Sequence, residues 1–284
     1  MNTLAEPVPT RAAPALQQAA PPGGLSTSAL PLLRVRHLSH RYGDRPVLHN
    51  AAFDLWPDEV LAVVGESGSG KTTLLNAIAA RIQPVSGSVS FLGREGALHD
   101  VHRMSLAQQR LLARTDWGFV HQNPADGLRM DVSAGANVAE RLMGLGERHY
   151  GRLRETAHAW LERVEIDSNR IDDTPRTFSG GMRQRLQIAR NLVTQPRLLF
   201  MDEPTSGLDV SVQARLLDLL RHLCAHLNLA VVIVTHDLAV ARLLAHRMVV
   251  MQRGHLVETG LTDQVLDDPQ HPYTQLLVSS VLQA

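Results

Sequence analysis

The eight residues from Gly65 to Thr72 constrain the fold of this chain more than any other feature. They read GESGSGKT, which fits the pattern GxxxxGK[ST]. An apolar run, Val60–Val64, precedes them, and a segment with helical periodicity, Lys71–Arg81, follows. A continuous apolar run is typical of a strand that is buried on both faces of a parallel sheet. Glycines let the backbone curl so that its N–H groups and the helix N-terminus can bind phosphate oxygens. We therefore predict a phosphate-binding loop here rather than an ordinary glycine-rich turn.

The basic residues of the chain single out one position in this loop. Of the 28 basic residues, 27 are arginine and only Lys71 is lysine. A bias of genome composition could produce the same ratio, so the surrounding motif has to decide. Because Lys71 lies in the loop, we interpret it as a site that needs a compact ammonium group rather than a planar guanidinium. Lys71 would pair with the β and γ phosphates of a nucleotide, and the Thr72 hydroxyl would bind Mg²⁺.

Composition excludes several other classes of protein. The chain has 284 residues with 28 acidic and 28 basic side chains, which gives no support for a nucleic-acid-coating protein. Apolar runs such as Leu229–Val234 are far shorter than the ~20 residues that span a membrane. The single cysteine, Cys224, excludes a disulfide framework and a multi-cysteine metal site. We expect a soluble, cytoplasmic protein with no nucleic-acid partner and no membrane span.

The order of apolar patterns predicts an α/β fold. Buried strands alternate with helical stretches, which favours a mostly parallel sheet. Half-exposed, alternating strands near the N-terminus form a separate antiparallel β subdomain, and helical periodicity dominates the middle of the chain. Further buried strands are expected at Leu198–Met201 and Ala230–Val234, alternating strands at Leu33–Leu38 and Val47–Leu55, and helices at Gly151–Val164, Gly181–Thr194 and Val210–His226. The predicted domains are a disordered Ala/Pro-rich tail at 1–30, a catalytic core at 31–99 and 176–260, an inserted helical subdomain at 100–175, and a C-terminal extension at 261–284.

Two further strands end in residues that suit phosphate chemistry. Asp202 and Glu203 follow a buried strand, and the carboxyl ends of parallel strands lie at the same edge of a sheet as the phosphate loop. Asp202 would hold Mg²⁺ through water, and Glu203 would polarise an attacking water; the alternative is a pair of solvated acids. His236 follows the next strand and could hydrogen-bond the γ-phosphate, although a structural histidine is the commoner case.

A Ser-Gly-Gly sequence at Ser179 to Gly181 begins another predicted helix. A helix start of this kind can bind an anion, but from the residues alone a plain helix cap is the favoured interpretation, since one nucleotide does not need two such sites.

Taken in order, these motifs resemble those of the ATP-binding-cassette (ABC) ATPases over residues 32–260. The resemblance implies a P-loop NTPase core, ATP and Mg²⁺ as ligands, and a dimer formed with a second copy or a related ATPase. It implies that Tyr42 stacks on adenine, that Gln122 couples the metal to the helical subdomain, and that Ser179 and Gly181 reach the γ-phosphate of the other subunit. Phe178 and Met182 replace the two ends of the usual Leu-Ser-Gly-Gly-Gln signature, whereas Ser179 and both glycines are intact.

The resemblance assigns the following roles by position. Catalysis is assigned to Glu203, His236, Lys71 and Gln122; metal binding to Thr72, Gln122 and Asp202; nucleotide binding to Tyr42, Gly65, Glu66, Ser67, Gly68, Ser69, Gly70, Lys71, Thr72, Thr73, Ser179, Gly180, Gly181 and Asp209, the last residue of a dimer-communicating loop that begins at Ser206.

Within this family, the region after Gln122 is similar to the ATPases of the carbon–phosphorus lyase system for phosphonate breakdown. That similarity implies a soluble ATPase that docks on the lyase core complex and couples ATP turnover to a conformational change there. The C-terminal residues His271 to Thr274 are similar instead to the ATPases of oligopeptide or nickel importers, which remain the alternative. A clamp that binds ATP without hydrolysing it is disfavoured because both Asp202 and Glu203 are present.

Overall fold

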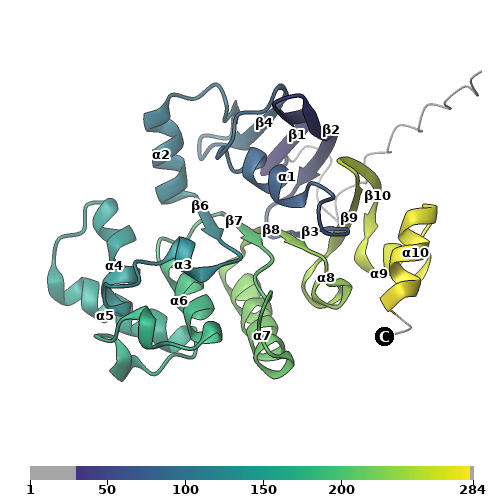
Figure 1. Cartoon of the computed structure of the whole chain (residues 1–284). Coiled ribbons are helices and arrows are strands. Elements are labelled where there is room, and N and C mark those ends of the chain that lie inside the picture. The colour runs from purple at the N-terminus through teal and green to yellow at the C-terminus, as the bar shows by residue number, and fades with distance from the viewer. Residues whose placement is uncertain (1–29, 282–284) are drawn as a thin grey trace, which may run out of the picture.

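The structure, a computed structural model, describes residues 30–281 and contains two β-sheets with helices around them (Figure 1). The tail predicted at residues 1–30 lies outside the described residues except for its last residue, Leu30. Over residues 30–281, no helix is both long enough and apolar enough to cross a membrane.

The larger sheet has six strands in the order β10-β9-β3-β8-β7-β6. Strands β9, β3, β8, β7 and β6 are parallel, and only the edge strand β10 runs antiparallel to its neighbour β9. The predicted α/β fold with a mostly parallel sheet is confirmed. The strands are β3 Val60–Val64, β6 Trp117–Val120, β7 Leu198–Asp202, β8 Ala230–Thr235, β9 Arg247–Gln252 and β10 His255–Leu261.

A second, antiparallel sheet and helix α1 cover one face of the larger sheet. Leu61 and Val63 of β3 pack into this layer, whereas Ala62 and Val64 face the opposite side, as expected for a strand buried on both faces. The strands of the second sheet lie in the order β2-β1-β4-β5. Their bounds are β1 Leu33–Tyr42, β2 Arg45–Leu55, β4 Ser86–Leu92 and β5 Leu98–Asp100; α1 spans Lys71–Ile78.

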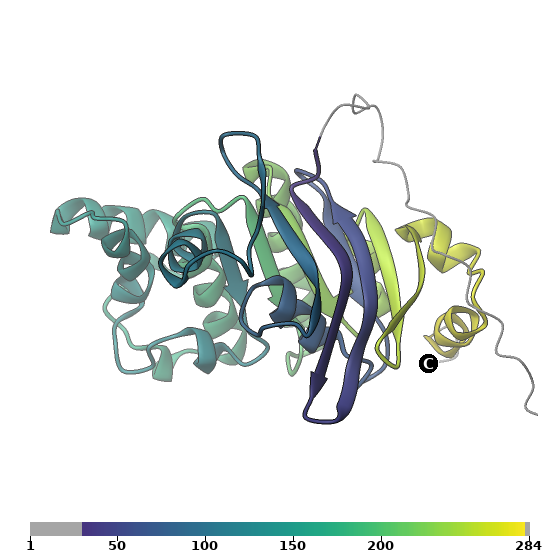
Figure 2. The ribbon, with the colours of Figure 1, turned by 90° about the horizontal axis from the view of Figure 1, so that it is seen from above.

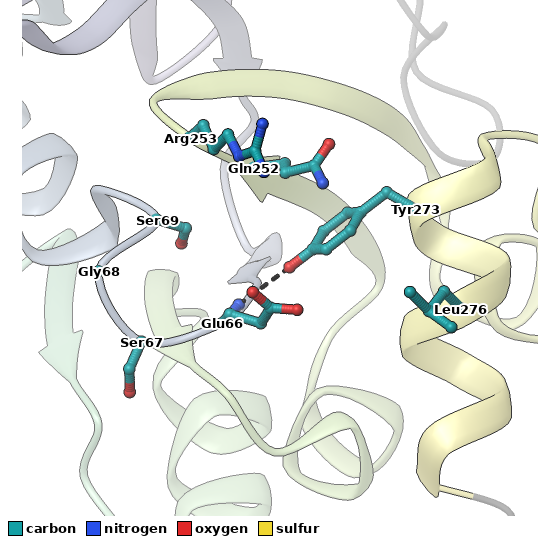
Figure 3. Close-up of a pocket in the computed structure, with 8 residues that line it drawn as sticks. All are labelled: Glu66, Ser67, Gly68, Ser69, Gln252, Arg253, Tyr273 and Leu276. Carbon is teal, nitrogen blue, oxygen red and sulfur yellow. Dashed lines mark hydrogen bonds between the residues drawn. The ribbon is translucent and has the colours of Figure 1, made fainter.

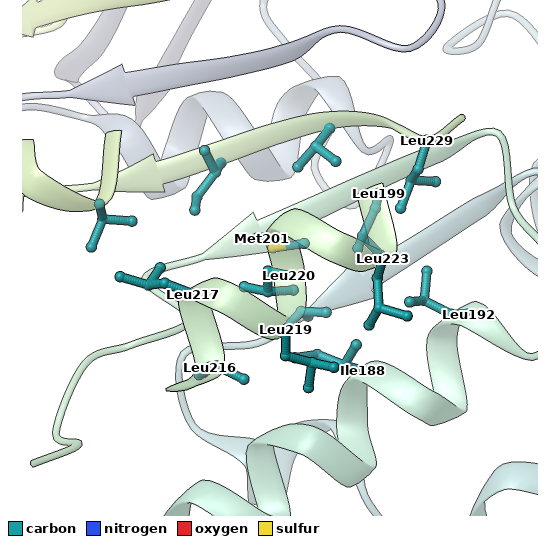
Figure 4. Close-up of a cluster of buried hydrophobic side chains, with 14 of the residues drawn as sticks. Ile188, Leu192, Leu199, Met201, Leu216, Leu217, Leu219, Leu220, Leu223 and Leu229 are labelled. Atoms are coloured by element: carbon teal, nitrogen blue, oxygen red, sulfur yellow. The ribbon is translucent and has the colours of Figure 1, made fainter. Parts of the chain in front are cut away.

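Helices α6, α7 and α8 cover the other face of the larger sheet. Figure 4 shows leucines of α7 packed between Leu199 and Met201 of β7 and the apolar side chains Ile188 and Leu192 of α6. Full burial of each such side chain contributes about 1.5–3 kcal/mol, so this layer fixes how α6 and α7 lie against the strand that carries Asp202. The bounds are α6 Gly180–Leu192, α7 Val210–Leu227 and α8 Leu238–Leu244.

Helix α2 packs beside β6 and the second sheet, and the other helices lie at the two ends of the larger sheet. Helices α3–α5 extend at one end, and α9 and α10 pack at the other (Figure 2). The segment 100–175 also contributes β6, an edge strand of the large sheet, so this range is not wholly helical. Its domain boundaries stay a prediction. The bounds are α2 Leu106–Thr115, α3 Pro124–Gly127, α4 Ala134–Gly144, α5 Tyr150–Arg163, α9 Thr262–Asp267, α10 Pro272–Val281, and the short 3-10 helices Ser168–Arg170 and Pro175–Thr177.

Candidate functional site

The loop from Gly65 to Gly70 leaves β3 and enters α1 through backbone conformations that suit glycine. Gly65, Gly68 and Gly70 have φ of +153°, +79° and +107°. A Cβ at Gly65 would collide with the carbonyl oxygen of Met251, and one at Gly70 would lie 2.8 Å from the carbonyl oxygen of Val47. Gly70 is the N-cap of α1, so the free N–H groups of the first helical turn point into the loop.

Lys71 closes the loop from inside. Its side chain is buried, and Nζ donates hydrogen bonds to the carbonyl oxygens of Gly65 (2.8 Å) and Glu66 (2.9 Å). Burial lowers the pKa of this ammonium group, while the nearby carboxylates of Glu203 and Asp202 act in the opposite direction. A cation held in this way, with no carboxylate of residues 30–281 in direct contact, is suited to receive an anionic phosphate.

The carboxylate of Asp202 lies beside the hydroxyl of Thr72. Thr72 Oγ1 donates to Asp202 Oδ1 over 3.1 Å, and Asp202 is only 7% exposed. Burial raises the pKa of Asp202 above its ordinary value. Two oxygens that converge in this way, one a carboxylate and one a hydroxyl, are the hard ligands that Mg²⁺ prefers.

Glu203, His236 and Gln122 meet at the carboxyl ends of three parallel strands. Glu203 Oε2 lies 3.1 Å from His236 Nδ1 and 3.4 Å from Gln122 Nε2. Gln122 Nε2 also lies 3.3 Å from Ser206 Oγ. The backbone of Glu203 has φ of +40°, a strained conformation for a residue with a side chain, and its N–H donates to Val234 O. The strand ends therefore bring together an acid, an imidazole and an amide that lie far apart in the sequence.

Gln187 of α6 positions the segment that carries Gln122, and sequence reasoning missed it. Gln187 is fully buried; its Oε1 accepts from the N–H of His121 (2.6 Å) and its Nε2 donates to the carbonyl of His121 (3.2 Å). One turn later, Asn191 Oδ1 accepts from the N–H of Phe119. The signal in the sequence was a pair of amide side chains, Gln187 and Asn191, one helical turn apart on a mostly apolar helix face. Amides in such a position need hydrogen-bond partners, which could have indicated this contact.

A cavity of about 490 Å³ opens over the loop. Seven of the fourteen predicted nucleotide-binding residues line it, together with Gln122 and Glu203 and two residues of β2, Arg45 and Val47, that sequence reasoning missed. Tyr42, at the end of β1, is 53% exposed and forms part of the cavity wall. The predicted residues that line the cavity are Tyr42, Ser67, Gly68, Gly70, Lys71, Thr72, Thr73, Gln122 and Glu203.

The structure places the predicted residues of the Ser-Gly-Gly segment outside this cavity. Ser179 is the N-cap of α6 and its hydroxyl accepts from Met182 N. Gly180 faces Leu208, and Gly181 approaches Val212 of α7 so closely that a Cβ would collide with it. Asp209, the N-cap of α7, is another predicted residue that lies outside the cavity. These residues form a second cluster that one chain does not bring to its own phosphate loop.

Comparisons with known proteins identify the class. The family model described as "ABC transporter" matches residues 48–206, and the model described as "Oligopeptide/dipeptide transporter, C-terminal region" matches residues 257–284. The first match contains the phosphate loop, Gln122, the Ser-Gly-Gly segment and the acidic strand end. The chain therefore belongs to the ABC family and is an ATP-binding ATPase of that family.

Comparisons with individual proteins show which members of the ABC family this chain is similar to. The chain is 66% identical over 253 residues to the putative phosphonates utilization ATP-binding protein PhnK of Escherichia coli K12, covering 89% of this chain and 98% of that protein. It is 38% identical over 230 residues to the E. coli oligopeptide transport ATP-binding protein OppF, covering 80% of this chain and 66% of that protein. Its fold matches the dimeric post-hydrolysis structure of the ATP-binding cassette MJ0796 bound to ADP and Pi, with a TM-score of 0.72, 26% identity, and coverage of 81% and 98%.

Proposed function

We propose that this chain is the ATPase of a carbon–phosphorus lyase system, in which dimers bind and hydrolyse Mg·ATP and couple this to a conformational change in the lyase core complex. The observation that carries the proposal is the 66% identity to the E. coli phosphonates utilization ATP-binding protein across 98% of that protein. Because ATP is its substrate, we expect the chain to act in the cytoplasm.

The chemistry that we propose follows from the cavity. The phosphate loop and Lys71 would hold the β and γ phosphates, while Tyr42 would stack on the adenine. Glu203 would polarise a water molecule for in-line attack on the γ-phosphate and accept its proton, and His236, in contact with the same carboxylate, would hold the transferred phosphate. Positioning and electrostatic stabilisation supply most of the rate enhancement in such transfers.

The donor set beside the loop fits a magnesium ion. Thr72 and Asp202 would hold it, with Gln122 at the edge of the same site, and the ion would neutralise negative charge on the phosphates. The raised pKa of Asp202 fits this role, because a cation at this position would favour the ionised form that burial disfavours.

Dimer formation would complete the site. Ser179, Gly180, Gly181 and Asp209 cluster at the starts of α6 and α7, away from the cavity of their own chain. We propose that they close over the nucleotide of a second copy or of a related ATPase. The dimeric cassette with a similar fold supports this arrangement.

The alternative is the ATP-binding subunit of an oligopeptide or nickel importer, and the match at residues 257–284 favours it. Identity to the oligopeptide ATPase is much lower, however, and this chain covers only 66% of that protein. We therefore place the lyase-associated role first.

Purification of the tagged, full-length Glu203→Gln variant from phosphate-starved cells tests this proposal. The preparation contains Mg·ATP but no detergent, and mass spectrometry identifies the proteins that co-elute. We expect subunits of the lyase core, and we expect them to be lost when Lys71→Ala is added to weaken nucleotide binding. A polytopic permease, recovered only from the membrane fraction, would establish the importer role instead.

A further inference from the structure

A second cavity, of about 310 Å³, lies on the outer side of the phosphate loop, between the loop, the turn that joins β9 to β10, and helix α10. Figure 3 shows the side chain of Tyr273 reaching from α10 across this cavity to the loop. Its hydroxyl accepts a hydrogen bond from the backbone N–H of Glu66, over 3.1 Å. The two residues are 207 positions apart in the sequence.

This hydrogen bond acts on the same peptide unit that Lys71 contacts. In a trans peptide the C=O and the following N–H point in opposite directions. The carbonyl of Gly65 accepts from Lys71 Nζ on the inner side of the loop, and the N–H of Glu66 donates to Tyr273 on the outer side. The Gly65–Glu66 peptide plane is therefore held from both sides, and rotation of this plane would break both hydrogen bonds.

Tyr273 is itself held firmly in place. Its side chain is 7% exposed and packs into the main hydrophobic cluster. The carboxylate of Glu258 on β10 accepts from the N–H groups of Gln270 (2.8 Å) and His271 (3.0 Å), just before α10 begins. His271 Nδ1 then accepts from the N–H of Tyr273 (3.2 Å). These contacts tie the first turn of α10 to the edge of the large sheet, so the tyrosine presents its hydroxyl from a rigid support.

The turn between β9 and β10 supports the same side of the loop. The N–H of Gly254 donates to the carbonyl of Ser69 over 2.8 Å, and Met251 O lies against Gly65. The C-terminal part of the chain thus contacts the loop at its start and near its end, opposite the nucleotide cavity.

We propose that Tyr273 is a positioning residue for ATP binding, which fixes the Gly65–Glu66 peptide so that Lys71 and the loop are held in the shape that receives phosphate. The proposal rests on the ATPase activity of the chain and is independent of which partner it serves.

Tyr273→Phe removes only the hydroxyl oxygen and leaves the ring in the core. The N–H of Glu66 then lacks its partner in a part-buried position, and the loop loses one neutral hydrogen bond. We expect KM for Mg·ATP to rise about three- to tenfold, the range expected for one such bond. Turnover at saturation should stay within twofold, because Glu203 and His236 belong to other strand ends.

The matched control is Thr274→Val on the next position of α10. Thr274 is 1% exposed, and among the described residues its hydroxyl has no hydrogen-bond partner. This variant removes a hydroxyl from the same helix without touching the loop, so KM should be unchanged.

Steady-state ATPase assays on the full-length protein, combined with hydrogen–deuterium exchange of the nucleotide-free protein, give two separate readouts. Tyr273→Phe should raise KM and speed exchange at the loop that contains Glu66, and Thr274→Val should do neither. A purely structural role for the tyrosine would lower Tm but leave KM and loop exchange within twofold of the wild type. That result, or an equal rise in KM for Thr274→Val, would overturn the proposal.

Discussion

Replacing Lys71 with arginine keeps the positive charge and changes only the shape of the side chain. Lys71 is 4% exposed, and its Nζ sits between two carbonyl oxygens at 2.8 and 2.9 Å. A longer planar guanidinium would overpack this site, at a cost of about 1–3 kcal/mol. It would also exchange a compact point charge for a fork that does not match this geometry. An overpacked side chain pushes the loop out of the shape that receives phosphate, and ATP binding then has to restore that shape. Because 1.4 kcal/mol is tenfold in affinity, the middle of that range corresponds to ATP binding about 30-fold weaker.

Isothermal titration calorimetry of Lys71→Arg with Mg·ATP, on the Glu203→Gln background that prevents turnover, measures this loss directly. Lys71→Ala should lose at least as much affinity, since it removes the charge as well. The exchange Arg215→Lys, on an exposed position of α7, is the control and should leave Kd unchanged. A Kd within threefold of the parent for Lys71→Arg would refute the conclusion that this site requires a compact ammonium group.

Three further outcomes are expected. Glu203→Gln should lower kcat at least about 100-fold while ATP affinity stays within threefold and light scattering shows more dimer; unchanged turnover would exclude the base role. Because burial raises the pKa of Asp202, its ionised form destabilises the nucleotide-free fold. Asp202→Asn should therefore raise Tm at pH values above that raised pKa and leave Tm unchanged below the ordinary aspartate pKa; a gain independent of pH would contradict this in thermal unfolding scans. Gly65→Ala should lower Tm by about 4–8 °C through backbone strain and collision with Met251 O, and an unchanged Tm would show that the loop can move aside.

The elements that carry the phosphate site could be predicted because their signals are local or follow from a topological rule. The apolar runs at Val60–Val64 and Ala230–Val234 are long enough to be recognised as buried strands. Once the sheet is parallel, the residues after each strand must gather at one edge, which is why Asp202, Glu203 and His236 are expected at the same edge as the phosphate loop. Thr72 and Gln122 lie at the same edge of the sheet. The hydrogen bonds from Thr72 to Asp202 and from Gln122 to Glu203 follow from this placement.

Strands β6 and β9 were missed for different physical reasons. Strand β6 has only four residues, and its position depends on the buried amides of Gln187 and Asn191, which lie on a helix some 70 residues later. Strand β9 begins with Arg247, a charge that would normally indicate an exposed position. Its guanidinium is buried because Glu59, 188 residues earlier, pairs with it at 2.8 Å. Pairings of this kind are visible only after the chain has folded.

The residues of the candidate site also differ in how far the sequence alone can predict their positions, and they fall into three groups. The loop and its lysine are consecutive in the sequence and could be predicted from spacing alone. Tyr273 reaches the loop because its ring packs in the core and Glu258 ties the start of α10 to the sheet edge, and no local pattern links residue 273 to residue 66. The third group is the cluster of Ser179, Gly180, Gly181 and Asp209, which lies outside the nucleotide cavity of its own chain. Its proposed role requires the surface of a second molecule, and only the resemblance to a family of dimeric ATPases could predict it.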